Sequence, residues 1–118
     1  MSWSQFDNTG ALKESIVAST YPIRSVSSNT AVNTGDYYIF LLTTTATAPF
    51  TITLPPAASN AGQQITVYDR QGNANNRNVT VAVTSGDYLD DALNGTYVIN
   101  VPREALTIVS DGSRWYMI

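Results

Sequence analysis

Residues 50–69 read FTITLPPAASNAGQQITVYD and contain the clearest structural pattern in the chain. Phe50, Ile52 and Leu54 alternate with threonines, and residues 64–69 alternate again, as in strands that bury only one face. Pro55 and Pro56 end the first strand, because proline has no N–H for the sheet ladder. Gly62 is expected at a positive φ before the second strand. The segment therefore predicts two strands joined by a turn.

Further short strands are predicted on both sides of this pair. Segments rich in β-branched and aromatic residues cover 36–43, 78–83, 96–101, 105–110 and 114–118, with turn residues between them. The first of these is rich in aromatic, β-branched and other apolar residues and predicts a buried strand. Residues 89–95 predict a loop with Leu89 and Leu93 pointing inward. Asp111-Gly112 predicts a tight hairpin that returns Trp115 to the core. We expect an all-β fold, a small antiparallel sandwich or open barrel.

The composition limits the classes of function. A chain of 118 residues is the size of one domain, and only 13% of its residues are charged. The net charge of -3 argues against binding to nucleic acid or to an anionic membrane surface. Cysteine and histidine are absent, so thiolate nucleophiles, Ser-His-Asp triads and Cys/His zinc sites cannot form. No signal peptide or membrane-spanning segment is predicted.

Residues 1–30 differ from the rest of the chain, and we predict that they form an N-terminal arm ahead of a β-module over 31–118. Leu12 and Ile16 lie four residues apart, which permits a short helix over 10–19. An extended arm, or a leader followed by a first strand, fits the residues equally well. Trp3 and Phe6 lie in a polar leader, where large aromatic side chains need a partner surface.

Several segments together resemble a small β-module of tailed-bacteriophage virion proteins. They are Gly35-Asp-Tyr-Tyr-Ile, residues 52–70, Gly72-Asn-Ala, Asn78-Val-Thr-Val and the closing LTIVSDGSRWYMI over 106–118. The resemblance covers about residues 31–118. It implies a homotrimer found in tail fibres, head fibres and related surface appendages. The chain is short and lacks a fibre shaft, which favours a small protein of the head surface.

Few residues suggest chemistry. Asp87, Asp90 and Asp91 form an acidic cluster, but its spacing does not match an EF-hand, and a hard cation needs about six oxygen ligands. We therefore predict a solvated turn, with no metal site and no cofactor. No paired carboxylates stand out, so an enzyme is the least favoured class of function. The one kind of enzyme that the composition still allows is a glycosidase that uses only carboxylates.

Binding residues are predicted from two patterns. Arginine pairs with carboxylates through its planar guanidinium and therefore suits interfaces. Arg70, Arg77 and Arg103 lie in or beside predicted loops, and ordinary surface charges explain them equally well. Tyr37 and Tyr38 are neighbours and should point to opposite faces of one strand. With Tyr68, Tyr88, Tyr97 and Tyr116 they could line a sugar site, but aromatic residues in strands ordinarily form core or cross-strand pairs. The predicted partner-binding residues are Trp3, Phe6, Leu12, Ile16, Arg70, Arg77 and Arg103.

These expectations combine into one functional hypothesis with two alternatives. The first is a trimeric cement protein on the outer surface of a phage virion, made in the host cytoplasm, whose arm binds the major capsid protein. The second is a tail-fibre, baseplate or head-fibre component in host attachment. The third is a carbohydrate-binding module. Only the last two predict binding to glycans.

Overall fold

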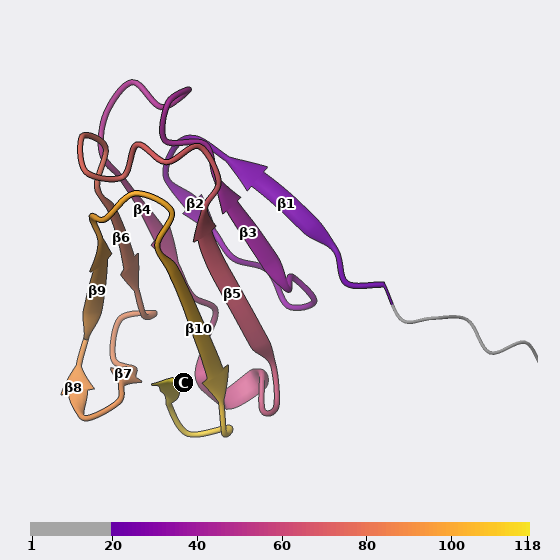
Figure 1. Cartoon of the computed structure of the whole chain (residues 1–118). Coiled ribbons are helices and arrows are strands. Elements are labelled where there is room, and N and C mark those ends of the chain that lie inside the picture. Colours follow the sequence, from indigo (N-terminus) through magenta and orange to yellow (C-terminus); the bar gives the residue numbers. More distant parts are fainter. Residues whose placement is uncertain (1–19) are drawn as a thin grey trace, which may run out of the picture.

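The computed structural model describes residues 20–118, which form two packed β-sheets (Figure 1). The larger sheet has the strand order β1 (Ile23–Val26), β3 (Tyr38–Leu41), β5 (Gln64–Asp69), β10 (Ala105–Ser110), β11 (Trp115–Met117), β7 (Tyr88–Leu89) and β8 (Ala92–Leu93). The smaller sheet has the order β2 (Thr30–Ala31), β4 (Phe50–Thr53), β6 (Val79–Ala82) and β9 (Thr96–Ile99). One short 3-10 helix, η1, covers Ala57–Ser59.

The all-β prediction is confirmed, and the predicted strands exist close to their predicted bounds. The segments 64–69 and 105–110 are strands over their full predicted length, and Gly62 has the expected positive φ of 84°. The strand at 36–43 is shorter and is not buried throughout. It covers Tyr38–Leu41 and alternates, because only Ile39 and Leu41 face the other sheet.

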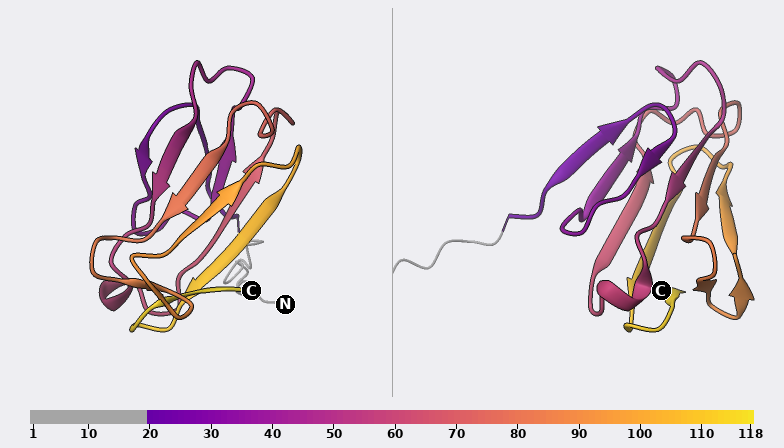
Figure 2. Two further views of the ribbon diagram at one scale, coloured as in Figure 1. Left: turned by 90° about the vertical axis from the view of Figure 1, so that its left-hand side faces the viewer. Right: turned by 180° about the vertical axis from the view of Figure 1, so that it is seen from behind.

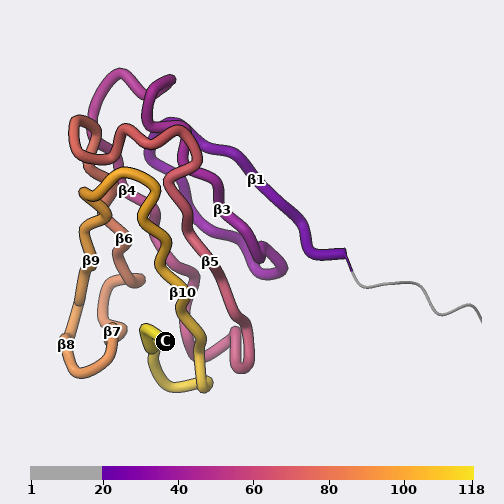
Figure 3. The backbone as a smooth tube through the Cα atoms, in the orientation of Figure 1, coloured from indigo at the N-terminus to yellow at the C-terminus, as the bar shows by residue number. Residues whose placement is uncertain are grey.

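The antiparallel pairing is wrong for the first half of the module. Strands β1, β3 and β5 run parallel to one another in one sheet, and β2, β4 and β6 run parallel in the other. From β1 to β6 the chain therefore crosses from one sheet to the other after each strand, as the backbone tube shows (Figure 3). Antiparallel pairs follow later, where β9 joins β6 and β10 joins β5. Alternation shows which face a strand buries, but it is the same for both pairing directions.

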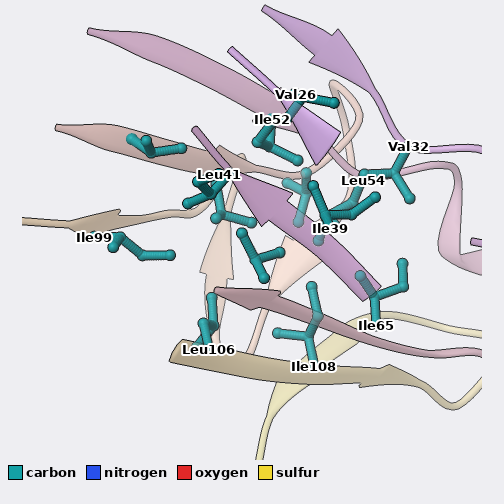
Figure 4. Close-up of a cluster of buried hydrophobic side chains, with 14 of the residues drawn as sticks. Val26, Val32, Ile39, Leu41, Ile52, Leu54, Ile65, Ile99, Leu106 and Ile108 are labelled. Carbon is teal, nitrogen blue, oxygen red and sulfur yellow. The ribbon is translucent and has the colours of Figure 1, made fainter. Parts of the chain in front are cut away.

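The core lies between the two sheets (Figure 4). Ile39, Leu41 and Ile65 from the larger sheet meet Ile52 and Ile99 from the smaller one, and all five are fully buried. Trp115 is also fully buried, as predicted, and its indole Nε1 donates a hydrogen bond to the Pro55 carbonyl at 2.9 Å. The hairpin at Asp111-Gly112 brings this ring back under the sheet.

The sheets include residues that the sequence analysis placed in the arm. Strand β1 pairs with β3 from Ile23 onward, and Val26 belongs to the core. The module thus begins before residue 31. The short helix predicted over 10–19 lies outside the described residues.

The segment at 89–95 departs from the predicted loop. Strands β7 and β8 form a small hairpin there, and Leu89 is buried as expected. Leu93 was expected to point inward but is 56% exposed, because β8 lies at the outer edge of the larger sheet.

Candidate binding surfaces

The outward side of the larger sheet forms a surface that we call the aromatic face. Strands β1, β3, β5 and β10 lie side by side there, as Figure 1 and the right-hand view of Figure 2 show. The outward residues of these four strands are Ile23, Ser25, Tyr38, Phe40, Gln64, Thr66, Tyr68, Ala105, Thr107 and Val109. None of them is charged, and each keeps part of its surface in solvent.

The aromatic rings of this face form one series with Tyr21 and Tyr37, which precede β1 and β3. Tyr21 stacks on Tyr37 with ring centroids 4.2 Å apart, and Tyr37 meets Tyr38 edge to face at 4.6 Å. Phe40 follows at 6.3 Å from Tyr38 and lies 5.8 Å from Tyr68. Tyr37 and Tyr38 therefore do not point to opposite faces as predicted. Tyr37 precedes β3, so the strand alternation does not apply to it.

Polar side chains on the aromatic face bond to one another. The Thr66 and Thr107 hydroxyl groups lie 3.0 Å apart across β5 and β10. The Gln64 side-chain amide donates to the Tyr37 hydroxyl at 3.2 Å. These two hydrogen bonds satisfy part of the hydrogen-bonding capacity of the face, which lowers the cost of removing these side chains from water.

The outward side of the smaller sheet is chemically different, and we call it the threonine face. Its outward residues on the strands are Ala31, Thr51, Thr53, Thr80, Ala82, Thr96 and Val98. Strands β4, β6 and β9 thus present small residues and no aromatic ring. Tyr97 points the other way and packs against the core.

A groove lies where the aromatic face meets the loops that follow β3, β5 and β9. These loops lie at the upper end of the ribbon in Figure 1. This arginine groove has a volume of about 610 Å³ and is lined by Phe40, Thr44, Tyr68, Arg70, Gln71 and Arg103. Two of the three predicted arginines are therefore brought together. Arg77 is not part of the groove, since its guanidinium donates to the carbonyl groups of Ala46 and Asn76.

Asp69 anchors the loops beneath this groove. The carboxylate is fully buried and accepts a hydrogen bond from the Thr43 hydroxyl at 2.5 Å. It also accepts from the backbone N–H groups of Gly72, Ala74 and Arg103 at 3.0–3.1 Å. Burial acts to raise the pKa of Asp69, but these four hydrogen bonds outweigh burial and lower it from 3.8. One charged side chain thus joins three loops.

The acidic cluster has structural roles. The Asp87 carboxylate accepts from the Ala57 N–H at the start of η1, and Asp90 accepts from Met117 N–H. Asp91 lies 3.6 Å from the Arg114 guanidinium, which also stacks over the Tyr88 ring at 4.2 Å. Within residues 20–118, no three acidic side chains converge into a metal-binding group.

Trp3, Phe6, Leu12 and Ile16 lie outside the described residues, so the structure places only the arginines among the predicted binding residues. Sequence reasoning missed Phe40 and Asp69. The sequence analysis places Phe40 in a strand that is buried throughout. The signal that identifies Phe40 as outward-facing is its alternation with Ile39 and Leu41, which point into the core. Asp69 follows an apolar alternation at an inward position, where an acidic residue must find partners.

No protein-family model matches this sequence, and no curated protein matches it either. Residues 20–118 contain no helix that is long and apolar enough to cross a membrane.

Proposed function

We propose that the protein is a non-enzymatic structural protein of a phage virion, a trimer that decorates and stabilises the assembled head. The observation that carries this proposal is the aromatic face, which is uncharged, rich in rings and open to solvent in one chain. The virion assignment itself comes from the resemblance of residues 31–118 to phage surface modules.

The aromatic face has the composition of a protein interface. Interface cores are depleted in charged residues and enriched in tyrosine and phenylalanine. The face follows this pattern, and Gln64, Thr66 and Thr107 on it take part in hydrogen bonds between side chains. Within residues 20–118, strand β1 is the edge strand of the larger sheet next to the face, and Ile23 is 59% exposed. An open edge invites a further strand or a covering chain.

Other copies of the chain are the proposed occupants of this face. The resemblance implies a homotrimer, and copies related by symmetry bury equivalent surfaces. The chain enters the module at β1, the edge strand of the same sheet. Residues 1–30, with Trp3, Phe6, Leu12 and Ile16, are proposed to reach the major capsid protein from this edge. A protein that binds only the assembled shell stabilises the shell by mass action.

Copy number per virion tests this function. Quantitative mass spectrometry against the major capsid protein should give hundreds of copies in a simple ratio to that protein. A few to a few dozen copies would favour a tail or vertex component, and absence from virions would overturn the virion assignment.

Deletion of residues 1–20 tests the role of the arm. The truncated protein keeps every described strand, so it should remain folded and trimeric while losing capsid binding. The control is the full chain added to the same undecorated capsids. A truncated trimer that still coats capsids would contradict the proposed arm.

The second candidate is a tail-fibre, baseplate or head-fibre component in host attachment. The arginine groove favours it, because two cationic side chains beside two aromatic rings suit a ligand that a purely mechanical protein does not need. A free carbohydrate-binding module would use the same groove.

A further inference from the structure

Three loops meet at the arginine groove and build its walls. Thr44 comes from the loop after β3, Arg70 and Gln71 follow β5, and Arg103 lies between β9 and β10. Phe40 and Tyr68 are paired across β3 and β5 and form the last row of the aromatic face toward this end. The groove therefore combines an apolar wall with charged side chains from separate loops.

The two groove arginines have no acidic partner in the described part of the chain. Within residues 20–118, the ion pairs join Arg24 to Asp36 and Arg114 to Asp91. The acidic residues beside the groove arginines in sequence are engaged elsewhere. Asp69 is buried beneath the loops, and Glu104 accepts hydrogen bonds from the Tyr97 hydroxyl and from the backbone at Asn100 and Val101.

Arg103 is held in an unusual backbone conformation. Its φ is +67°, a left-handed conformation that arginine rarely adopts and that glycine or asparagine ordinarily supplies. Its N–H donates to Asp69 at 3.1 Å, and its guanidinium donates to the Arg70 carbonyl. The side chain lies against Gly72, where an added Cβ would be 2.8 Å from Arg103 Nε. The loops thus fix this guanidinium in place at the cost of strain.

Such a constellation points to a specific ligand chemistry. Guanidinium groups bind carboxylates through two parallel hydrogen bonds. The Phe40 and Tyr68 rings, 5.8 Å apart and inclined at 72°, offer an apolar surface for the C–H side of a sugar ring. Phosphate-rich nucleic acid fits less well, because it calls for a larger cluster of cations than this protein of net charge -3 provides.

We propose that the arginine groove binds a carboxylate-bearing sugar within an acidic polysaccharide, with Arg70 and Arg103 on the carboxylate and Phe40 and Tyr68 against the ring. This goes beyond the proposed structural function, since a trimeric decoration protein needs no glycan. The groove is open, which suits a polymer that passes across it.

The test is titration of the full-length protein with a hexuronate oligosaccharide. Binding is measured by isothermal titration calorimetry and by the NMR shifts of the arginine Nε–H groups. The matched ligand is the same oligosaccharide after chemical reduction of its carboxyl groups. We expect saturable binding of the unreduced oligosaccharide only. Salt should weaken this binding at ionic strengths where the electrostatic screening length falls to about 3 Å.

Matched variants locate the site. Arg70→Gln and Arg103→Gln should each weaken binding by about tenfold or more, as expected for loss of a charge-assisted pair. Arg77→Gln is the control, because Arg77 lies at the same end of the module but outside the groove. Arg70 makes no side-chain hydrogen bond within residues 20–118, so its variant should fold normally even if the Arg103 variant does not.

Three results would overturn the proposal. They are no binding at millimolar ligand, equal binding of the carboxyl-reduced oligosaccharide, and an equal loss of binding in Arg77→Gln. Stronger binding of an acidic peptide than of the hexuronate would show that the groove recognises a protein carboxylate. None of these results bears on the oligomeric state or copy number, so the proposed function is tested separately.

Discussion

Asp69 is the residue on which the loop end of the module depends most. Its two carboxylate oxygens accept four hydrogen bonds from three loops, and the side chain is fully buried. A buried acceptor with this many donors is costly to replace, because the donors in the interior, Thr43 Oγ1 and Ala74 N–H, lose their partner without gaining water.

Asp69→Asn should destabilise the fold by about 2–5 kcal/mol. Asparagine keeps one acceptor oxygen, and its NH2 group would face two of the N–H donors. Urea unfolding followed by circular dichroism measures the change. Asp111→Asn is the matched control, since Asp111 is exposed and its Oδ1 acceptor, bonded by Ser113 and Arg114 N–H, is retained. Equal stability of the two variants would contradict the anchoring role.

The lowered pKa of Asp69 predicts a dependence of stability on pH. The folded protein keeps this carboxylate ionised at pH values where the unfolded chain has begun to take up a proton, below 3.8. The contribution of Asp69 is therefore fully present above this pH and is lost as the pH falls through the lowered folded-state value. Asp111 adds a loss in the same direction, since backbone hydrogen bonds from Arg114 and Ser113 lower its pKa as well.

Unfolding free energies measured near neutral pH and at several values below 3.8 test this dependence. The unmodified protein should lose stability more steeply than Asp69→Asn, which has no ionisable group at this position. Parallel curves for the two proteins would show that Asp69 does not couple folding to protonation.

At the scale of elements, the loop from Arg70 to Asn78 is shaped to admit the Arg103 side chain. Gly72 has a φ of +74°, and the Arg103 side chain occupies the space beside it. Gly62 has a similar φ of +84° with no atom within 4 Å of its Cβ position. Replacing each glycine by alanine therefore distinguishes two costs. At position 62 only the backbone is strained, whereas at position 72 the new Cβ also meets the Arg103 side chain.

Gly72→Ala should cost more stability than Gly62→Ala. Both changes place alanine at a positive φ, which costs about 1 kcal/mol, but only the first forces Arg103 to move. Thermal unfolding measures the difference, and the NMR shift of Arg103 Nε–H reports the displacement. An unchanged Arg103 signal in Gly72→Ala would contradict the close packing of the Arg103 side chain against residue 72.

The strands were largely predictable from sequence, whereas their pairing was not. Phe50, Ile52 and Leu54 alternate with threonines because one side of β4 is buried, and this pattern is local. The parallel partners of β4 are Thr30–Ala31 and Val79–Ala82, which lie more than twenty residues away on either side. Pairing direction follows from how the connections cross between sheets, and no local pattern reports it.

The candidate sites show the same division. Arg70 and Arg103 were singled out by residue type, but 33 positions separate them, and only the fold brings them together. Phe40 was misplaced because an apolar strand with aromatic residues reads as buried on both sides. An uncharged outward face looks like core in sequence, since both lack charge.

At the scale of the whole molecule, the two outer faces make opposite predictions about assembly. The aromatic face is uncharged and carries the rings of Tyr38, Phe40 and Tyr68, whereas the threonine face carries small residues. Thr66 and Thr80 occupy comparable half-buried positions, each on an inner strand, one on each face. The same substitution at these two positions therefore compares the faces directly.

The most direct measurement is native mass spectrometry of the unmodified protein, Thr66→Lys and Thr80→Lys at equal concentration. Burying an unpaired lysine in an interface costs several kcal/mol, whereas a lysine exposed on a face in solvent costs little. We predict a mass of three times 12.8 kDa for the unmodified protein and for Thr80→Lys, and a folded monomer for Thr66→Lys. A monomeric unmodified protein, or a trimer that Thr66→Lys leaves intact while Thr80→Lys dissociates it, would contradict assembly through the aromatic face.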